Sequence, residues 1–202
     1  MVFESQYLGS VPYEKAFKLQ QEIAIQIASQ NTIALIGLEH PDVLTLGYRA
    51  QASEEVLSSQ LPIVQSTRGG LATIHSVGQL VIYPIINIKN HRLGVREYIC
   101  LLLKTTQELL AELGVTSWID TDQIGLYTEN GKIAFCGVQI KNGISQHGIS
   151  LNVRNDLRLF DQIRSCGFLN PKLDRLQNYQ VTHTLEELFQ MWTKIFKKNF
   201  LN

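Results

Sequence analysis

The sequence predicts a single domain of the α+β class, and three observations lead to that class. Helical periodicity occurs near both ends of the 202-residue chain and once in its middle. Strand-like runs are grouped between these stretches instead of alternating with them one by one. Two Asn-Gly turns join three of the runs in succession, which is typical of antiparallel hairpins. No internal repeat or linker divides the chain, so residues 1–202 are expected to share one core.

Three stretches carry apolar residues every three to four positions, as amphipathic helices do. The first follows Pro12, which favours a helix start, and the second is expected to end at Gly114. The third begins with a capping-box pattern, in which Thr184 is followed by Glu187 three positions later. The stretches span Tyr13–Ile27, Val95–Leu113 and Leu185–Phe196.

Seven short apolar runs, bounded by Gly, Pro, Asn or Asp, are predicted to be strands. The last three are separated by Asn130-Gly131 and Asn142-Gly143, so we expect them to form a three-stranded antiparallel meander. The runs are Thr32–Ile36, Val43–Leu46, Leu61–Ser66, Leu80–Ile88, Gln123–Tyr127, Lys132–Ile140 and Ile144–Val153.

Composition and charge exclude several classes of function. The chain has 18 Lys+Arg and 18 Asp+Glu, and this balance argues against nucleic acid as a partner. No apolar run approaches the roughly 18 residues of a membrane span. The N-terminus lacks the pattern of a signal peptide, so a cytoplasmic protein without a membrane partner is expected. Walker and dinucleotide loops are absent, so the sequence calls for no ATP or NAD cofactor.

The cysteines and histidines do not follow the spacing of a disulfide framework or a zinc site. No C-x-x-C or H-x-x-x-H occurs, so no metal is expected. The cysteines are Cys100, Cys136 and Cys166, and the histidines are His40, His75, His91, His147 and His183.

The segment that begins with Arg68-Gly69-Gly70 lies between two strand-like runs and is the first candidate for chemistry. Paired glycines let backbone N–H groups approach a ligand, and Arg68 adds a fixed positive fork. A tight turn with a surface arginine explains the same residues equally well.

Lys132 opens the middle strand of the meander. A lysine at this position is usually solvated, and the functional alternative is a partly desolvated amine that perturbs a neighbour's pKa. Strict alternation would put Cys136 on the face of Lys132, where it is expected to be a small core residue.

Two further segments hold single candidates. His147 lies in the last strand of the meander, where a lone histidine is more often structural than catalytic, and Gly148 indicates a bulge or a close approach. Cys166 lies in a loop between Arg164 and Gly167. A loop cysteine near a basic residue suits a nucleophile of low pKa, although an unreactive buried thiol is the commoner case.

In their combination and order these segments resemble the octanoyl-[acyl-carrier-protein]:protein N-octanoyltransferases, also called lipoate-protein ligase B. The likeness runs along nearly the whole chain. Three departures, Ser76-Val77, Gln146 and Ser165, replace residues that the family usually has, which bears on loop rigidity and rate more than on the reaction. The matching segments are Glu39-His40-Pro41 through Gly47, Arg68-Gly69-Gly70 through His75, Gly78-Gln79-Leu80 with Tyr83-Pro84, Gly131-Lys132-Ile133-Ala134, His147-Gly148 with Leu151-Asn152-Val153, and Cys166-Gly167.

The resemblance implies the fold of the biotin- and lipoate-protein ligases, a mixed sheet with flanking helices. It implies that Cys166 is the acyl-thioester nucleophile and that Lys132 lowers its pKa and acts as acid and base. It also implies that an octanoyl pocket is lined by Arg68, Gly69, Gly70, Leu71, Ala72, Thr73, Ile74, His75, Phe135, Cys136, Gly137, His147, Gly148, Ile149 and Ser150.

The expected activity is transfer of an octanoyl group from octanoyl-acyl carrier protein to a lysine of lipoyl domains. The resemblance implies that these belong to E2 subunits of 2-oxoacid dehydrogenases and to the H protein of glycine cleavage. Backbone N–H groups near Gly69-Gly70 or Gly167 are candidates for stabilising the oxyanion. Three alternatives stay open: an ATP-dependent ligase of the same fold, an amidotransferase between lipoyl-domain proteins, and a binding module without turnover.

Overall fold

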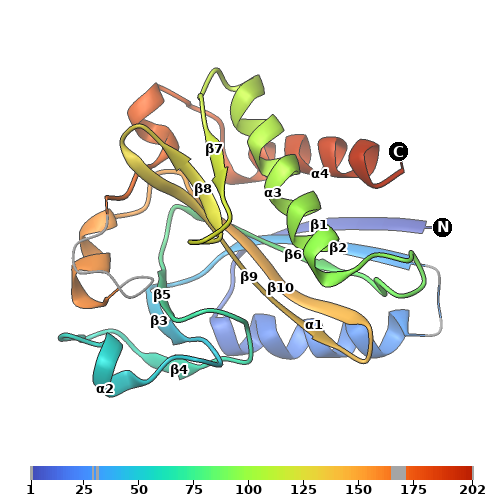
Figure 1. Cartoon of the computed structure of the whole chain (residues 1–202), viewed down its shortest axis with the longest axis horizontal. Coiled ribbons are helices and arrows are strands. Elements are labelled where there is room, and N and C mark those ends of the chain that lie inside the picture. The colour runs from blue at the N-terminus through green and yellow to red at the C-terminus, as the bar shows by residue number, and fades with distance from the viewer. Residues whose placement is uncertain (1, 29, 31, 165–171, 202) are drawn as a thin grey trace.

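The computed structural model describes residues 2–28, 30, 32–164 and 172–201, and these form two sheets with helices around them (Figure 1). The elements in chain order are β1 (Val2–Ser10), α1 (Tyr13–Ile27), β2 (Thr32–Glu39), β3 (Val43–Leu46), α2 (Ala52–Glu55), β4 (Ile63–Gln65), β5 (Ala72–His75), β6 (Gln79–Ile85), α3 (Val95–Glu112), β7 (Trp118–Asp120), β8 (Gly125–Thr128), β9 (Gly131–Lys141), β10 (Ile144–Asn152), η1 (Leu157–Gln162), η2 (Leu176–Tyr179) and α4 (Leu185–Leu201).

The large sheet is mixed and has the order β1-β2-β6-β10-β9-β8-β7. Strands β1 and β2 run parallel, and each later neighbour is antiparallel. The meander of β8, β9 and β10 is confirmed, and its second turn has positive φ at Asn142 (53°) and Gly143 (85°), as a tight hairpin requires. The small sheet has the order β4-β3-β5. The α+β class and the mixed sheet are therefore confirmed.

Helices α3 and α4 cover one face of the large sheet and α1 covers the other (Figure 1). Strand β2 shows how the sequence produces these layers, because its side chains alternate between the faces. Ile33 and Leu35 pack in the core with α3 and α4, whereas Ala34 and Ile36 pack against α1. A third cluster joins the small sheet to Phe135 of β9 and to η1.

The helix ends follow the sequence signals. Helix α1 begins directly after Pro12, and α3 ends before Gly114, whose φ is +75°. The predicted capping box of α4 is present, because the Thr184 N–H donates to Glu187 Oε2 (2.7 Å) and the Glu187 N–H donates to Thr184 Oγ1 (3.2 Å).

Six elements of the described chain were not predicted, and two of them are the short 3₁₀ helices η1 and η2. Strand β1 is an edge strand with few buried side chains, and it lacks the apolar alternation that marks a strand. Strand β5 lies inside the segment that begins with Arg68, for which the sequence favours a ligand-binding loop and a tight turn equally, and its residues are all buried, so they do not alternate. The other two, α2 and β7, contain four and three residues and are too short to show a period.

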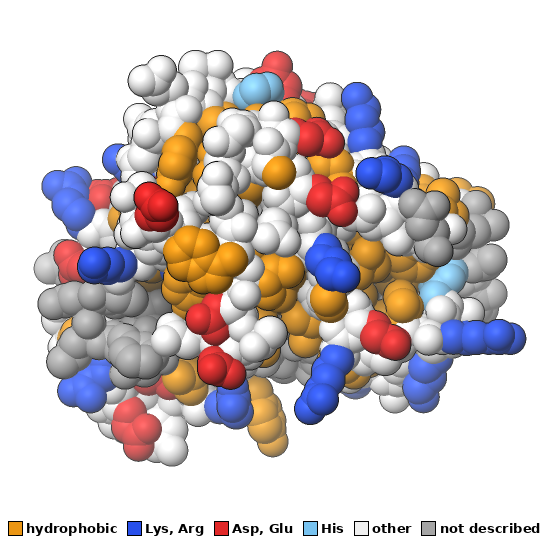
Figure 2. Space-filling view, turned by 45° about the horizontal axis from the view of Figure 1, so that its top comes forward, with side chains coloured by type: hydrophobic (Ala, Val, Ile, Leu, Met, Phe, Trp, Pro, Cys, Tyr) orange, Lys and Arg blue, Asp and Glu red, His pale blue; other side chains and the backbone are white. Residues whose placement is uncertain are grey.

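The outer surface carries charges of both signs. Figure 2 shows Lys, Arg, Asp and Glu interspersed around exposed apolar side chains on the face that it presents. Within the part of the chain that the structure describes, no helix has the length and apolar character needed to cross a membrane.

Candidate active site

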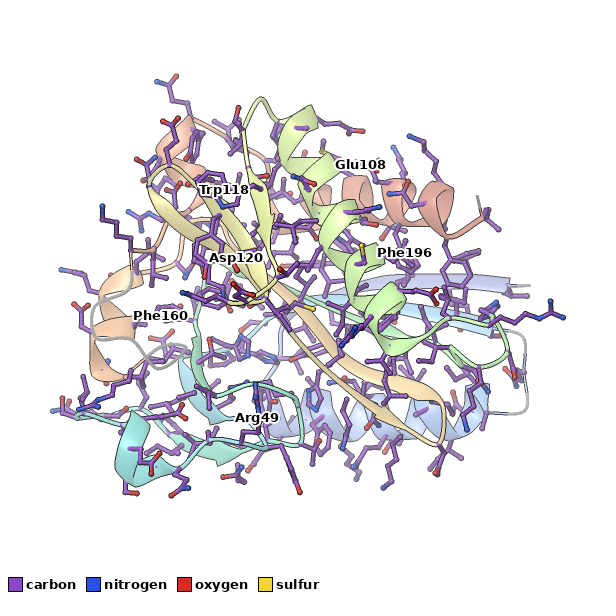
Figure 3. All side chains as sticks on the ribbon, viewed as in Figure 1. Arg49, Glu108, Trp118, Asp120, Phe160 and Phe196 are labelled. Atoms are coloured by element: carbon purple, nitrogen blue, oxygen red, sulfur yellow. The ribbon has the colours of Figure 1, made fainter. Side chains whose placement is uncertain are left out.

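A cavity of about 390 Å³ lies where the small sheet meets β9 and β10 of the large sheet. Its volume is in the range of small-molecule sites. Most of the residues implied by the resemblance line it, namely Arg68, Gly69, Gly70, Leu71, Ala72, Thr73, His75, Phe135, Cys136, Gly137, His147, Gly148, Ile149 and Ser150. Ile74 does not line the cavity, because its side chain is buried in the small-sheet core with Leu44 and Phe160. Phe160 lies on η1, and Arg49, which also lines the cavity, lies on the segment after β3 (Figure 3).

Arg68 is buried rather than at the surface. Its Nη2 donates to the carbonyl of Thr45 (2.7 Å) and to Thr45 Oγ1 (2.9 Å), and its Nη1 donates to the carbonyl of Gly69 (3.1 Å). The guanidinium therefore fastens the glycine loop to β3. The Gly69 N–H donates to the carbonyl of Val138 (3.0 Å), so the role of this group as an oxyanion donor is not supported.

Lys132 is 4% exposed, so the expectation of an ordinary solvated lysine is wrong. Its Nζ donates to the carbonyl of Gln123 (2.7 Å). The same nitrogen lies 5.0 Å from the ring centroid of Phe135 and 5.2 Å from that of Tyr127. Aromatic faces attract an ammonium group, so this pocket keeps an amine next to the cavity with little contact with water.

A bulge in β9 corrects the predicted position of Cys136. Leu126 pairs with Ala134 but Tyr127 pairs with Lys132, so β9 has one extra residue. An extra residue reverses the faces of the residues beyond it, which puts Lys132 on the side of Phe135 and not of Cys136. Cys136 packs against the main core, and burial, opposed by nearby Lys132, raises the pKa of its thiol to about 12. This thiol is therefore a poor nucleophile.

The main chain of Lys132 is tied to the segment that follows Cys166. The Lys132 N–H donates to the carbonyl of Lys172 (2.9 Å), and the Asp174 N–H donates to the carbonyl of Lys132 (3.0 Å). Cys166 itself lies outside the described residues. The structure therefore shows the position of Lys132 and, bonded to it, the chain at Lys172, which is six residues beyond Cys166.

Asp174 holds in place the segment that begins at Lys172. It is fully buried, and its Oδ2 accepts hydrogen bonds from the hydroxyls of Thr128 and Tyr179. Its Oδ1 accepts from Asn178 Nδ2 (2.7 Å) and from the Arg175 N–H (2.8 Å). Burial alone would raise the pKa of this carboxyl, but the hydrogen bonds outweigh burial and lower the pKa.

Glu55 of α2 joins the chain before Cys166 to the cavity wall. Its carbonyl accepts from the Arg164 N–H (2.7 Å), and its Oε2 accepts from the N–H of Ala72. Burial raises the pKa of the Glu55 carboxyl above its usual value. Both described ends of the predicted nucleophile segment are thus held by main-chain hydrogen bonds.

Three histidines that are far apart in the sequence form a cluster around Tyr13. The Tyr13 ring centroid lies 5.2 Å from His40, 5.9 Å from His75 and 6.4 Å from His147. Spacing along the chain gave no sign of this cluster, because His75 and His147 come from β5 and β10 and His40 from the segment after β2. Among the described residues, no group of three His, Cys, Asp or Glu side chains is arranged to hold a metal ion.

The hydrogen bonds of this cluster are compatible with neutral histidines. His40 donates from Nδ1 to the Val11 carbonyl (2.6 Å) and accepts at Nε2 from the Tyr83 hydroxyl (2.7 Å). His75 donates from Nδ1 to Gln79 Oε1 (2.7 Å). A neutral imidazole carries one proton, so each ring has one donor and one acceptor.

Burial keeps all three rings uncharged. It lowers the pKa of His40 to about 4 and that of His75 well below its usual value. Burial, helped by the charge of Arg68, lowers the pKa of His147 to about 3. Within the described residues, two atoms of cavity-lining side chains, His147 Nδ1 and Thr73 Oγ1, are buried without a hydrogen-bond partner. Such atoms need water or a polar ligand atom.

Comparison with known proteins identifies the family. Residues 12–197 match the lipoyl protein ligase A/B catalytic domain. The chain is 35% identical over 181 residues to an octanoyltransferase of Chromobacterium violaceum. The matched residues make up 90% of this chain and 87% of the relative. It is 36% identical over 180 residues to an octanoyltransferase of Klebsiella pneumoniae, covering 89% and 84%.

Solved structures agree on the fold. A lipoate-protein ligase A bound with ATP matches with a TM-score of 0.79 at 14% identity, over 98% of this chain and 85% of that one. A biotin protein ligase from Aquifex aeolicus matches with a TM-score of 0.62 at 13% identity, over 98% and 70%. The predicted biotin/lipoate-protein ligase fold is therefore confirmed. The chain belongs to the lipoyl protein ligase A/B catalytic domain family and, within it, to the octanoyltransferases.

Proposed function

We propose that this acyltransferase moves an octanoyl group from octanoyl-acyl carrier protein to a lysine of lipoyl domains through a thioester on Cys166. The acceptors in this proposal are the lipoyl domains of 2-oxoacid dehydrogenase E2 subunits and the glycine cleavage H protein. Residues 1–202 act as one catalytic domain in the cytoplasm. The family and the names of the relatives support the transfer, and the geometry of the site supports the assignment of the residues.

One observation carries the assignment: a buried lysine amine lies at the wall of the cavity, and its main chain is bonded to the chain that follows Cys166. The Nζ of Lys132 is held by a carbonyl and two rings, and its peptide N–H is bonded to Lys172. Cys166 precedes Lys172 by six residues. This arrangement supports a thiol and an amine that work as a pair.

The proposed first half-reaction exchanges one thioester for another. A free thiol has a pKa of about 8.5, so an adjacent ammonium favours the reactive thiolate. The Cys166 thiolate attacks the octanoyl carbonyl, and the carbon–sulfur bond to the carrier breaks. The departing carrier thiolate takes a proton from Lys132. Bond energy is conserved in this exchange, so ATP is not required.

The second half-reaction forms an amide. The incoming lysine of the lipoyl domain must be neutral, and the now neutral Lys132 accepts the proton that it loses on attack. The bond between the octanoyl carbonyl and Cys166 sulfur breaks, and the thiolate is restored beside the ammonium. The apolar side chains around the cavity suit the hydrocarbon part of the acyl group, and the ring of His147 is uncharged.

The test is intact-protein mass spectrometry after incubation with octanoyl-acyl carrier protein in the absence of ATP. We expect an added octanoyl group that maps to Cys166 and leaves when a lipoyl domain is added. Cys166→Ser should abolish both events, whereas Cys100→Ser should retain them because Cys100 is exposed on α3 and does not line the cavity. Transfer at the normal rate by Cys166→Ser would contradict the proposed nucleophile.

The same assay separates the alternatives. Octanoate with ATP as the only donor tests a ligase, and an octanoylated lipoyl-domain protein as the donor tests an amidotransferase. Faster acylation of Cys166 by the octanoylated protein than by the acyl carrier protein would overturn the proposed donor. Tight association without a covalent adduct would indicate a binding module.

A further inference from the structure

Strand β10 turns one side chain to the opposite face of the sheet. Ile149 packs in the core that α3 and α4 cover, so strict alternation would place His147, two residues earlier, on the same face. Its ring instead stacks on Phe17 and Tyr13 of α1, with centroid distances of 5.2 and 6.4 Å. The φ of His147 is +58°, in the left-handed region that residues other than glycine rarely adopt.

The reversal coincides with a gap in the hydrogen-bond ladder between β6 and β10. The paired register ends at Ile149 and Ile82 and is met again at the bridge between Ile144 and Asn87; continued between them, it would put His147 opposite Pro84, which has no N–H to donate. The Pro84 carbonyl accepts hydrogen bonds from the hydroxyls of Ser145 (2.8 Å) and Tyr98 (2.9 Å). The N–H of His147 is bonded elsewhere.

Gln20 of α1 accepts that N–H. Its Oε1 lies 2.6 Å from the backbone nitrogen of His147, although the two residues are 127 positions apart. Gln20 is 1% exposed, whereas the next residue, Gln21, is exposed. A buried N–H requires an acceptor. Here the acceptor is the side chain of Gln20 in α1, and not a carbonyl of the neighbouring strand β6.

The ring of His147 is fixed at its far end as well. Thr67 Oγ1 donates its single hydrogen to Gln139 Oε1 (2.8 Å), so it accepts from His147 Nε2 (3.2 Å). Since the ring is neutral, Nδ1 is left as a buried acceptor without a partner among the described residues. Thr67 directly precedes the glycine loop, so the histidine connects α1, β10 and that loop.

We propose that Gln20 is a positioning residue for the acyl group: its side-chain oxygen holds the backbone of His147 in the left-handed conformation and so keeps the ring in the cavity wall. Gln20 does not line the cavity, and it acts through His147. The inference rests on the proposed octanoyl transfer, because it assigns the cavity to the acyl chain. It adds a residue that sets affinity and chain-length preference.

The first experiment measures the dissociation constants of octanoate and decanoate for the wild type and for Gln20→Met. An unsatisfied buried N–H is expected to release the His147 backbone and to weaken octanoate binding about tenfold. The ratio of the two constants should change too, because the wall itself moves. Gln21→Met is the matched control and should keep wild-type values. Wild-type constants and an unchanged ratio in Gln20→Met would overturn the proposal.

A double-mutant cycle tests whether the effect passes through His147. Glycine adopts a positive φ without strain, so in a His147→Gly background the Gln20→Met change should alter octanoate affinity less than twofold. A further tenfold loss in that background would refute the mechanism. If Gln20→Met does not fold, Gln20→Asn serves with the same readouts, since its shorter side chain withdraws the oxygen.

Failure of this inference and failure of the proposed function have different signatures. If wild-type protein acylates a lipoyl domain while both Gln20 variants bind octanoate normally, only the role of Gln20 is wrong. If wild-type protein forms no octanoyl adduct, the proposed function fails whatever the Gln20 variants do.

Discussion

Two buried basic regions reach the cavity, one through His75 and His147 and the other through Lys132, and they differ in how their nitrogen atoms are held. In the histidine cluster (His40, His75 and His147), burial lowers each pKa and keeps the rings neutral. In the lysine region (Lys132 with Lys172 and Asp174), an amine donates to a carbonyl and lies near two aromatic rings. The rings of the first region are uncharged although Arg68 lies near them, and the second region keeps an amine. The comparison indicates which part of the cavity suits hydrocarbon and which suits chemistry.

Removal of the Lys132 amine should have the largest effect on the reaction. Lys132→Met should lower the rate of octanoyl transfer by about 10²–10⁴-fold, the usual contribution of a general acid–base group. It should also raise the apparent pKa for alkylation of Cys166 by iodoacetamide, measured as rate against pH. Lys141→Met, at the exposed end of the same strand, is the control. An unchanged alkylation profile would show that Lys132 does not affect the pKa of Cys166.

The second change removes the anchor of the lysine region. Asp174→Ala leaves four donors without their acceptor, and we expect the free energy of unfolding to fall by about 3 kcal/mol. Urea denaturation measures this value. Asp161→Ala, at an exposed position in η1, should change it by less than about 0.5 kcal/mol. Equal effects of the two substitutions would show that the Asp174 network contributes little.

The histidine cluster predicts how stability depends on pH. An unfolded histidine has a pKa of about 6.5, while burial lowers the pKa of His40 to about 4 and that of His147 to about 3 in the folded protein. The unfolded chain therefore binds more protons below pH 6.5, so stability is complete above that pH and falls as the solution is acidified. Each histidine contributes up to about 1.4 kcal/mol per pH unit.

Thermal unfolding between pH 7 and pH 4 checks this slope. His147→Asn removes one titrating ring, and asparagine tolerates a positive φ, so the fall in stability should be shallower. His183→Asn changes an exposed ring and should leave the slope as it is. If stability falls as steeply with pH in His147→Asn as in the wild type, other groups cause the acid sensitivity.

The smallest expected effect concerns one hydroxyl in the histidine cluster. Tyr83→Phe leaves His40 Nε2 without its donor and should lower the free energy of unfolding by about 1 kcal/mol. Tyr48→Phe, in a residue that is 81% exposed, is the control. Equal stability of Tyr83→Phe and wild type would mean that water replaces the hydroxyl.

The sequence predicts local features well and long-range features poorly. The helices and the meander could be predicted because their signals, periodicity and Asn-Gly turns, lie within a few residues of each other. The burial of Lys132 could not, since it depends on an extra residue in β9 and on the rings of Phe135 and Tyr127. Most of the pocket residues that the resemblance implies line the cavity. Ile74 is the exception, because its side chain faces the core.

The histidine cluster was missed for a different reason. Its three rings come from segments that tertiary packing alone brings together, so no spacing rule applies to them. Gln20 had no signal beyond its place on the buried side of a helix. Such residues become visible only when the hydrogen-bond partners of each backbone group are followed.

The bond from Gln20 to His147 also bears on native-state hydrogen exchange. Amide protons in a sheet usually exchange when strands separate, but the proton at His147 is protected by a side chain of α1. Undocking of this helix would expose that proton while neighbouring amides of β10 stayed protected by β6 and β9. One amide inside the large sheet therefore reports on the attachment of a helix.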